Sequence, residues 1–119
     1  MRQKFLLIIS SKGFEYIENS SDLSNRISYV LYKETLLFNI HYKAEADMDT
    51  FIKSIIDIIK TKRGYKRVVI VGDFNFDSKD KYNMFIKKLI DLCPELILYS
   101  LKTGLADYND AIITFTSKS

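Results

Sequence analysis

The sequence predicts an α/β fold in which a mixed sheet carries two helices on one face. Two patterns predict it. Apolar residues at spacings of three and four indicate the helices, and short runs of β-branched and aromatic residues indicate the strands. Their order of strand, helix and strand is typical of a right-handed parallel crossover. With 119 residues, 47% of them hydrophobic and 28% charged, the chain is expected to form one domain over residues 1–119.

The amino-terminal part is expected to contain strands and a hairpin. Residues 5–10 form a short apolar run, and residues 18–22 form a polar stretch that predicts a loop. Residues 27–32 then alternate in polarity, and a Lys-Glu pair separates them from residues 35–41. Two such runs with a short separation indicate an antiparallel hairpin.

Two amphipathic segments are expected to be helices. The first follows Asp47 or Asp49 as a cap and closes near Gly64; the second follows Ser78 and stops at Pro94. The apolar face of the first consists of Met48, Phe51, Ile52, Ile55, Ile56 and Ile59. The apolar face of the second consists of Tyr82, Phe85, Ile86, Leu89, Ile90 and Cys93.

The most informative stretch is a strand over residues 67–71 that runs into Gly72, Asp73, Phe74 and Asn75. Its run of β-branched residues suits a strand covered on both faces, as in a parallel sheet between helices. Gly72 is expected to free the backbone, and Asp73 and Asn75 should then point the same way. Ligands bind at this carboxyl edge in open α/β sheets, although the same four residues are also typical of a simple turn.

The single cysteine and the single histidine limit the possible chemistry. Cys93 lies at helical spacing within an apolar face, which favours a packing role over that of a nucleophile. A chain with only His41 cannot build a site of several histidines. A metal would therefore be held by carboxylates, amides and water, a ligand set that suits Mg²⁺ or Mn²⁺.

Charge and hydropathy narrow the partners and the compartment. A net charge of +3 permits contact with nucleic acid or another polyanion, and would equally serve solubility. No apolar run approaches the ~18 residues of a membrane span, so we expect no membrane partner and an intracellular, cytoplasmic protein. A basic cluster is interpreted as a solvated helix end away from the candidate site, with a nucleic-acid footprint as the alternative. It consists of Lys60, Lys62, Arg63, Lys66 and Arg67.

Four segments in order carry a resemblance to a known family. The three stronger matches are Gly-Asp-Phe-Asn at residues 72–75, Asn-Ile-His at residues 39–41 and Asn-Arg at residues 25–26. A weaker fourth match lies at residues 110–113. Together they resemble the endonuclease/exonuclease/phosphatase superfamily, the DNase I-like metal-dependent phosphoesterases. The resemblance implies a partial DNase I-like layered fold and a Mg²⁺-dependent phosphodiesterase or nuclease, acting on nucleic acid or another phosphodiester.

The resemblance also implies roles for individual residues. Asp73 matches the carboxylate that orients or deprotonates the attacking water, and Asn75 matches the amide that holds a phosphate oxygen; both are implied metal ligands. His41 matches a histidine that binds phosphate or donates a proton. Arg26 and Asn39 match contacts to the substrate phosphate.

Asp110 is the remaining catalytic match. It matches an aspartate that orients a terminal histidine in the family, and this chain has no such histidine. The glutamate that binds the metal and the final Asp-His pair are also missing, so the chain is expected to be shortened at both ends. Catalytic activity is therefore left open. The alternative is a non-catalytic binding or interaction protein on a shortened phosphoesterase scaffold. We further expect self-association, or a partner chain that covers exposed sheet.

Overall fold

The computed structural model describes residues 17–19, 27–43, 47–76, 78–103 and 108–117, with the side chains of residues 17–19, 103 and 108–110 left undescribed. The strand expected at residues 5–10 and the Asn-Arg pair at residues 25–26 lie outside these ranges. The described elements follow one another as β1 (Ile17–Asn19), β2 (Ile27–Tyr32), β3 (Thr35–His41), α1 (Met48–Thr61), β4 (Arg67–Phe76), α2 (Lys79–Leu92), β5 (Leu96–Thr103) and β6 (Tyr108–Ser117).

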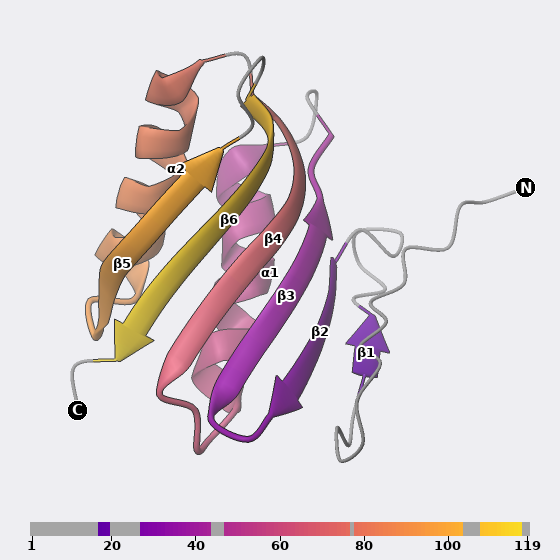
Figure 1. Ribbon diagram of the computed structural model, residues 1–119, viewed down its shortest axis with the longest axis vertical. Helices are drawn as coiled ribbons and strands as arrows, with labels where there is room; N and C mark the ends of the chain where they lie inside the picture. Colours follow the sequence, from indigo (N-terminus) through magenta and orange to yellow (C-terminus); the bar gives the residue numbers. More distant parts are fainter. Residues whose placement is uncertain (1–16, 20–26, 44–46, 77, 104–107, 118–119) are drawn as a thin grey trace, which may run out of the picture.

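The strands of the described residues form one mixed six-stranded sheet in the order β1-β2-β3-β4-β6-β5. Both helices lie on the same face of it, behind the sheet in Figure 1. The α/β class and the placement of two helices on one face of a mixed sheet are therefore confirmed. None of the described helices is long and apolar enough to cross a membrane.

The amino-terminal hairpin forms as the sequence predicts. β2 and β3 pair antiparallel from Ile27 opposite Ile40 to Tyr32 opposite Thr35. Lys33 in the turn has a φ of 54°, a left-handed conformation that a tight turn between twisted strands requires. Residues 18 and 19, expected in a loop, instead belong to β1, which pairs antiparallel with β2.

The central unit is the crossover from β3 through α1 to β4. β3 and β4 are parallel, with Leu36 beside Val68 and Phe38 beside Ile70, and the connection is right-handed (Figure 1). Asp47 caps α1, because its side chain accepts a hydrogen bond from the Thr50 N–H at 3.0 Å. Ser78 occupies the cap position of α2, but its side chain makes no capping hydrogen bond there.

β4 differs from its expected form in two respects. The strand does not stop at Val71 but continues through residues 72–75 to Phe76, with a bulge between Asp73 and Phe76. Nor is it covered equally on both faces: Val68 and Ile70 are buried, whereas Val69 and Val71 are half-buried. The reason is that both helices pack on the same face, so the described residues leave the other face only partly covered.

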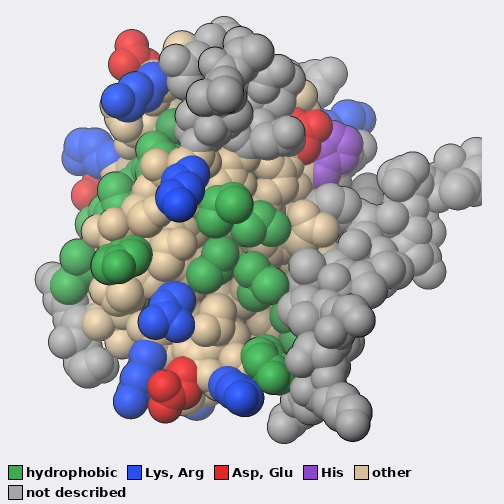
Figure 2. All heavy atoms as spheres, in the orientation of Figure 1, with side chains coloured by type: hydrophobic (Ala, Val, Ile, Leu, Met, Phe, Trp, Pro, Cys, Tyr) green, Lys and Arg blue, Asp and Glu red, His purple; other side chains and the backbone are tan. Residues whose placement is uncertain are grey.

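The sheet face opposite the helices, which we call the open face, is apolar at its centre. Cross-strand register places Leu37 beside Val69 and Val71 beside Ile112. Ile112 is 47% exposed, and Ile97 of β5 is 46% exposed. Figure 2 views this face and shows hydrophobic side chains at its centre with lysine and arginine around them.

Gly72 lets β3 and β4 approach closely. Its φ is 142°, and a Cβ atom built there would lie 2.0 Å from the Ile40 carbonyl oxygen. No rotamer change can relieve a clash with backbone. The glycine is therefore a requirement of the strand pairing, whereas Gly64, with a φ of 85°, has no atom within 4 Å of such a Cβ.

These two glycines make a matched pair for a stability measurement. We expect Gly72→Ala to lower the free energy of unfolding by roughly 3 kcal/mol, because strain and backbone displacement add. Gly64→Ala should cost only about 1 kcal/mol, the cost of a positive φ alone. Urea unfolding monitored by circular dichroism measures both, and equal losses would contradict the close approach.

Cys93 is fully buried, which confirms the expected packing role. Burial, the main cause, and the neighbouring Glu95, the second, raise the pKa of the Cys93 thiol to about 12.

The reactivity of Cys93 tests this placement. Since only the thiolate reacts, alkylation by iodoacetamide at pH 8 should be at least about a hundredfold slower in the native chain than in urea. The control is Asp57→Cys in a Cys93→Ala background, which places a thiol on the exposed side of α1 and should react quickly. If Cys93 of the native chain reacted as fast as this exposed thiol, its buried placement would be refuted.

Candidate active site

The candidate site lies at the carboxyl ends of the parallel strands β3 and β4. His41 is the last residue of β3, and the strand register places it directly beside Asp73 of β4. His41 Nε2 lies 4.0 Å from Asp73 Oδ2, and the two side chains are 38% and 44% exposed. The structure therefore brings together two residues that are far apart in the sequence, in a place that solvent can reach.

Asp110 enters the same edge from a third strand. β6 pairs antiparallel with β4 and sets Asp110 beside Asp73 in the register. The backbone therefore arranges His41, Asp73 and Asp110 on three adjacent strands, β3, β4 and β6. The side chain of Asp110 lies outside the described part of the chain.

Asn75 is fixed by the bulge at the end of β4. Its φ is 52°, a left-handed conformation that asparagine tolerates better than most residues. Its N–H donates to Asp73 Oδ1 at 3.1 Å, and its Nδ2 donates to the Tyr42 carbonyl oxygen at 2.6 Å. Asn75 thus holds the Asp73 carboxylate in place and ties β4 to the segment that follows His41.

Tyr42 is a positioning residue that sequence reasoning did not single out. Its N–H donates to the Asp73 carbonyl oxygen at 2.8 Å, while its own carbonyl accepts the bond from Asn75. Tyr42 is 5% exposed, and burial raises the pKa of its phenol, as does the nearby Asp47 carboxylate. The available sequence signal was an aromatic residue immediately after the histidine.

Aromatic rings underlie the site and set the direction of its polar side chains. Phe74 and Phe76 alternate with Asp73 and Asn75 along β4 and are buried beneath the helices. The ring centroid of Phe76 lies 4.7 Å from that of Tyr82 in an edge-to-face arrangement, and that of Phe74 lies 5.4 Å from those of Tyr82 and Phe85. Because these rings face the core, Asp73 and Asn75 face outward.

The spacing of His41 and Asp73 suits a shared ligand atom. One water molecule at about 2.8 Å from each polar atom fits a separation of 4.0 Å, because water can donate to the carboxylate and bond the imidazole at the same time. The Asp73 carboxylate and the Asn75 amide oxygen are hard ligands of the kind that Mg²⁺ and Mn²⁺ prefer. These two residues suit such an ion, but they make up only part of a ligand set. Among the described residues, no group of three or more His, Cys, Asp or Glu side chains could hold a metal ion.

The other expected contacts are placed less completely. Asn39 lies two positions before His41 on β3 and is half-buried beside Val71 in the register, so it shares the open face with the site. Arg26 falls outside the described residues. The basic cluster lies at the carboxyl end of α1 and the start of β4, opposite the site along the parallel strands, as expected. Within it, Lys66 pairs with Glu34 at 3.5 Å.

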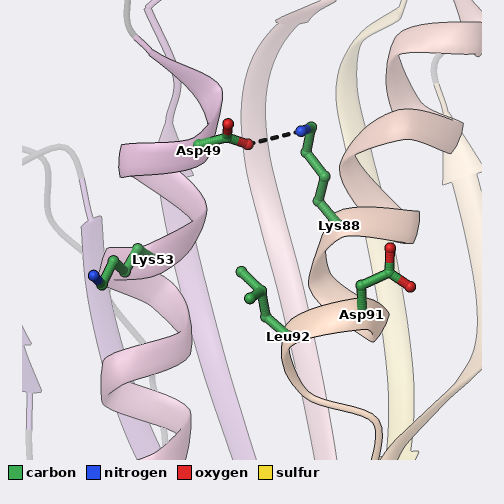
Figure 3. A pocket seen from close by; sticks show the side chains of 5 residues that line it. All are labelled: Asp49, Lys53, Lys88, Asp91 and Leu92. Atoms are coloured by element: carbon green, nitrogen blue, oxygen red, sulfur yellow. Dashed lines mark ion pairs between the residues drawn. The ribbon is translucent and has the colours of Figure 1, made fainter.

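A groove on the helix layer is separate from this edge. It lies between α1 and α2, has a volume of about 350 Å³, and is lined by Asp49, Lys53, Lys88, Asp91 and Leu92 (Figure 3). Lys88 Nζ bonds Asp49 Oδ1 at 2.7 Å across it, which raises the pKa of Lys88. Its two cationic and two anionic groups balance, so it offers no excess charge to an ionic ligand.

Comparison with protein-family models, with curated proteins and with solved structures finds no match for this chain.

Proposed function

We propose that this chain binds a phosphodiester at the β3–β4 edge and hydrolyses it slowly with Mg²⁺ or Mn²⁺, as a phosphodiesterase or nuclease with a reduced site. The observation that carries the proposal is the His41–Asp73 pair, 4.0 Å apart at the carboxyl ends of two parallel strands. This edge is where open α/β sheets bind ligands. The sequence resemblance to metal-dependent phosphoesterases supplies the reaction class.

The geometry supports a division of labour between the two side chains. In phosphoryl transfer the attacking and leaving oxygens lie roughly in line on opposite sides of phosphorus. Groups only 4.0 Å apart therefore serve neighbouring oxygens on one side. In this proposal Asp73 orients the attacking water and accepts its proton as the new P–O bond forms. His41 holds a non-bridging phosphate oxygen, and the leaving oxygen takes its proton from solvent as the old bond breaks.

The role proposed for Asn75 follows from its hydrogen bonds. One Nδ2 hydrogen is directed at the Tyr42 carbonyl, and the second can be donated to a phosphate oxygen. Asn75 Oδ1 and the Asp73 carboxylate would hold the metal, which supplies charge stabilisation for the phosphate oxygens. Asp110, beside Asp73 in the register, is the proposed source of a further carboxylate.

A second candidate is a non-catalytic binding domain. Two of the polar groups already have structural roles, since Asp73 Oδ1 accepts the Asn75 N–H and Asn75 Nδ2 bonds Tyr42. Residues that stabilise a strand end in this way can be retained for folding or binding without turnover. The two candidates differ in whether bound phosphodiester is hydrolysed.

The first test is hydrolysis of bis(4-nitrophenyl) phosphate, plasmid DNA and RNA with Mg²⁺ or Mn²⁺. We expect a low rate that EDTA abolishes, that Asp73→Ala lowers at least about a hundredfold and that His41→Ala lowers about tenfold. Asp91→Ala, which removes a carboxylate on the helix layer, should leave the rate unchanged.

Two outcomes would reject the enzymatic candidate. A rate equal in wild type and Asp73→Ala would indicate a contaminating activity. Binding of a fluorescent oligonucleotide that is lost in His41→Ala, without turnover in any metal, would establish the non-catalytic candidate instead.

Metal affinity provides an independent measurement. Because only Asp73 and Asn75 are proposed as ligands among the residues with described side chains, Mn²⁺ should bind with a Kd in roughly the millimolar range. Water-proton relaxation during a Mn²⁺ titration measures it. Asp73→Asn should abolish this binding and Asp91→Asn should leave it unchanged; micromolar binding would show that the ligand set is larger than proposed.

A further inference from the structure

We propose that two copies of this chain associate through β5, which pairs antiparallel with the β5 of the second copy and joins two six-stranded sheets. β5 is the last strand in the sheet order, at the left edge of the sheet in Figure 1. The backbone groups on the outer side of an edge strand can pair with another strand. This inference is independent of the proposed phosphodiesterase activity.

The edge is apolar at its centre and exposed. Tyr99 is 75% exposed, Ile97 46% and Leu98 38%. No proline occurs within β5, and its one charged residue, Lys102, lies near the end. Outside the bulge between Leu98 and Ser100, a long edge strand with these features favours pairing with another strand.

Charge complementarity selects a second copy as the partner and sets the register. Glu95, immediately before β5, and Lys102 are both exposed. When Leu98 lies opposite Tyr99 of the second copy, Glu95 of each copy lies opposite Lys102 of the other. Two-fold symmetry therefore forms the same ion pair at both ends of the interface. The resulting pattern, apolar in the middle and charged at the rim, is typical of protein interfaces.

Side-chain direction is consistent with this register. Leu96 pairs with Ser117 and Ile97 with Thr116, whereas Ser100 pairs with Thr114, so an extra residue occurs between Leu98 and Ser100. Because of this bulge, Ile97 and Ser100 both lie on the open face, as opposed residues of a strand pair must. The bulge interrupts regular backbone pairing at the two-fold axis. The side chains of Leu98 and Tyr99 are therefore expected to hold the centre.

The test is to exchange the charges at Glu95 and Lys102 and to measure the dissociation constant of the dimer by sedimentation equilibrium at several protein concentrations. Wild type should be a reversible dimer. Lys102→Glu and Glu95→Lys should each raise the dissociation constant about tenfold, because like charges then meet at both ends. The double variant Glu95→Lys with Lys102→Glu should restore the wild-type value. Matched control Lys33→Glu, in the β2–β3 turn, should have no effect.

A second variant acts at the two-fold axis. Tyr99→Lys brings two like charges together at this axis and should abolish the dimer, while its circular dichroism spectrum shows a folded chain. The control is Met84→Lys, at an exposed position of α2. A monomeric wild type would overturn the proposal. So would a dimer that withstands the β5 variants and is lost in Ile112→Lys, because the open face would then be the interface.

Discussion

The parallel pairing of β3 with β4 is the constraint on which the rest of the structure depends. It requires Gly72, because any Cβ there would meet the Ile40 carbonyl oxygen at 2.0 Å. The same register sets His41 beside Asp73 and carries the chain through α1, whose buried isoleucines cover the sheet. The strand pairing that this close approach permits therefore sets the position of His41 relative to Asp73 and connects the two strands through α1. Changes at Gly72 are therefore expected to affect stability and site geometry together.

The site combines a support of buried aromatic rings with exposed polar groups. Phe74 and Phe76 are buried among the rings of Tyr82 and Phe85, and β4 alternates so that Asp73 and Asn75 face outward. Hydrogen bonds from Asn75 to Asp73 Oδ1 and to the Tyr42 carbonyl then fix the carboxylate relative to β3. Such preorganisation lowers the cost of orienting groups around a bound phosphate. It would serve binding and catalysis alike, which is why turnover must be measured directly.

The two faces of the sheet have different roles in the proposals. The helix-covered face holds the core, and the groove between α1 and α2 is lined by balanced charges. The open face is apolar at its centre and carries the site at one end, while β5 ends the sheet at the side. Pairing through β5 would leave the β3–β4 edge accessible in both copies. An assembly of this kind is therefore compatible with ligand binding at each site.

The sequence by itself determined the two helices, the hairpin and the candidate pair of Asp73 and Asn75, because apolar spacing, capping residues and short-range polar motifs are local signals. It did not determine that β4 continues to Phe76, that Val69 and Val71 would be only half-buried, or that Tyr42 would hold the site together. Those features depend on which face both helices choose and on strand register. Contacts between residues distant in the chain decide them, and only the tertiary structure contains those contacts.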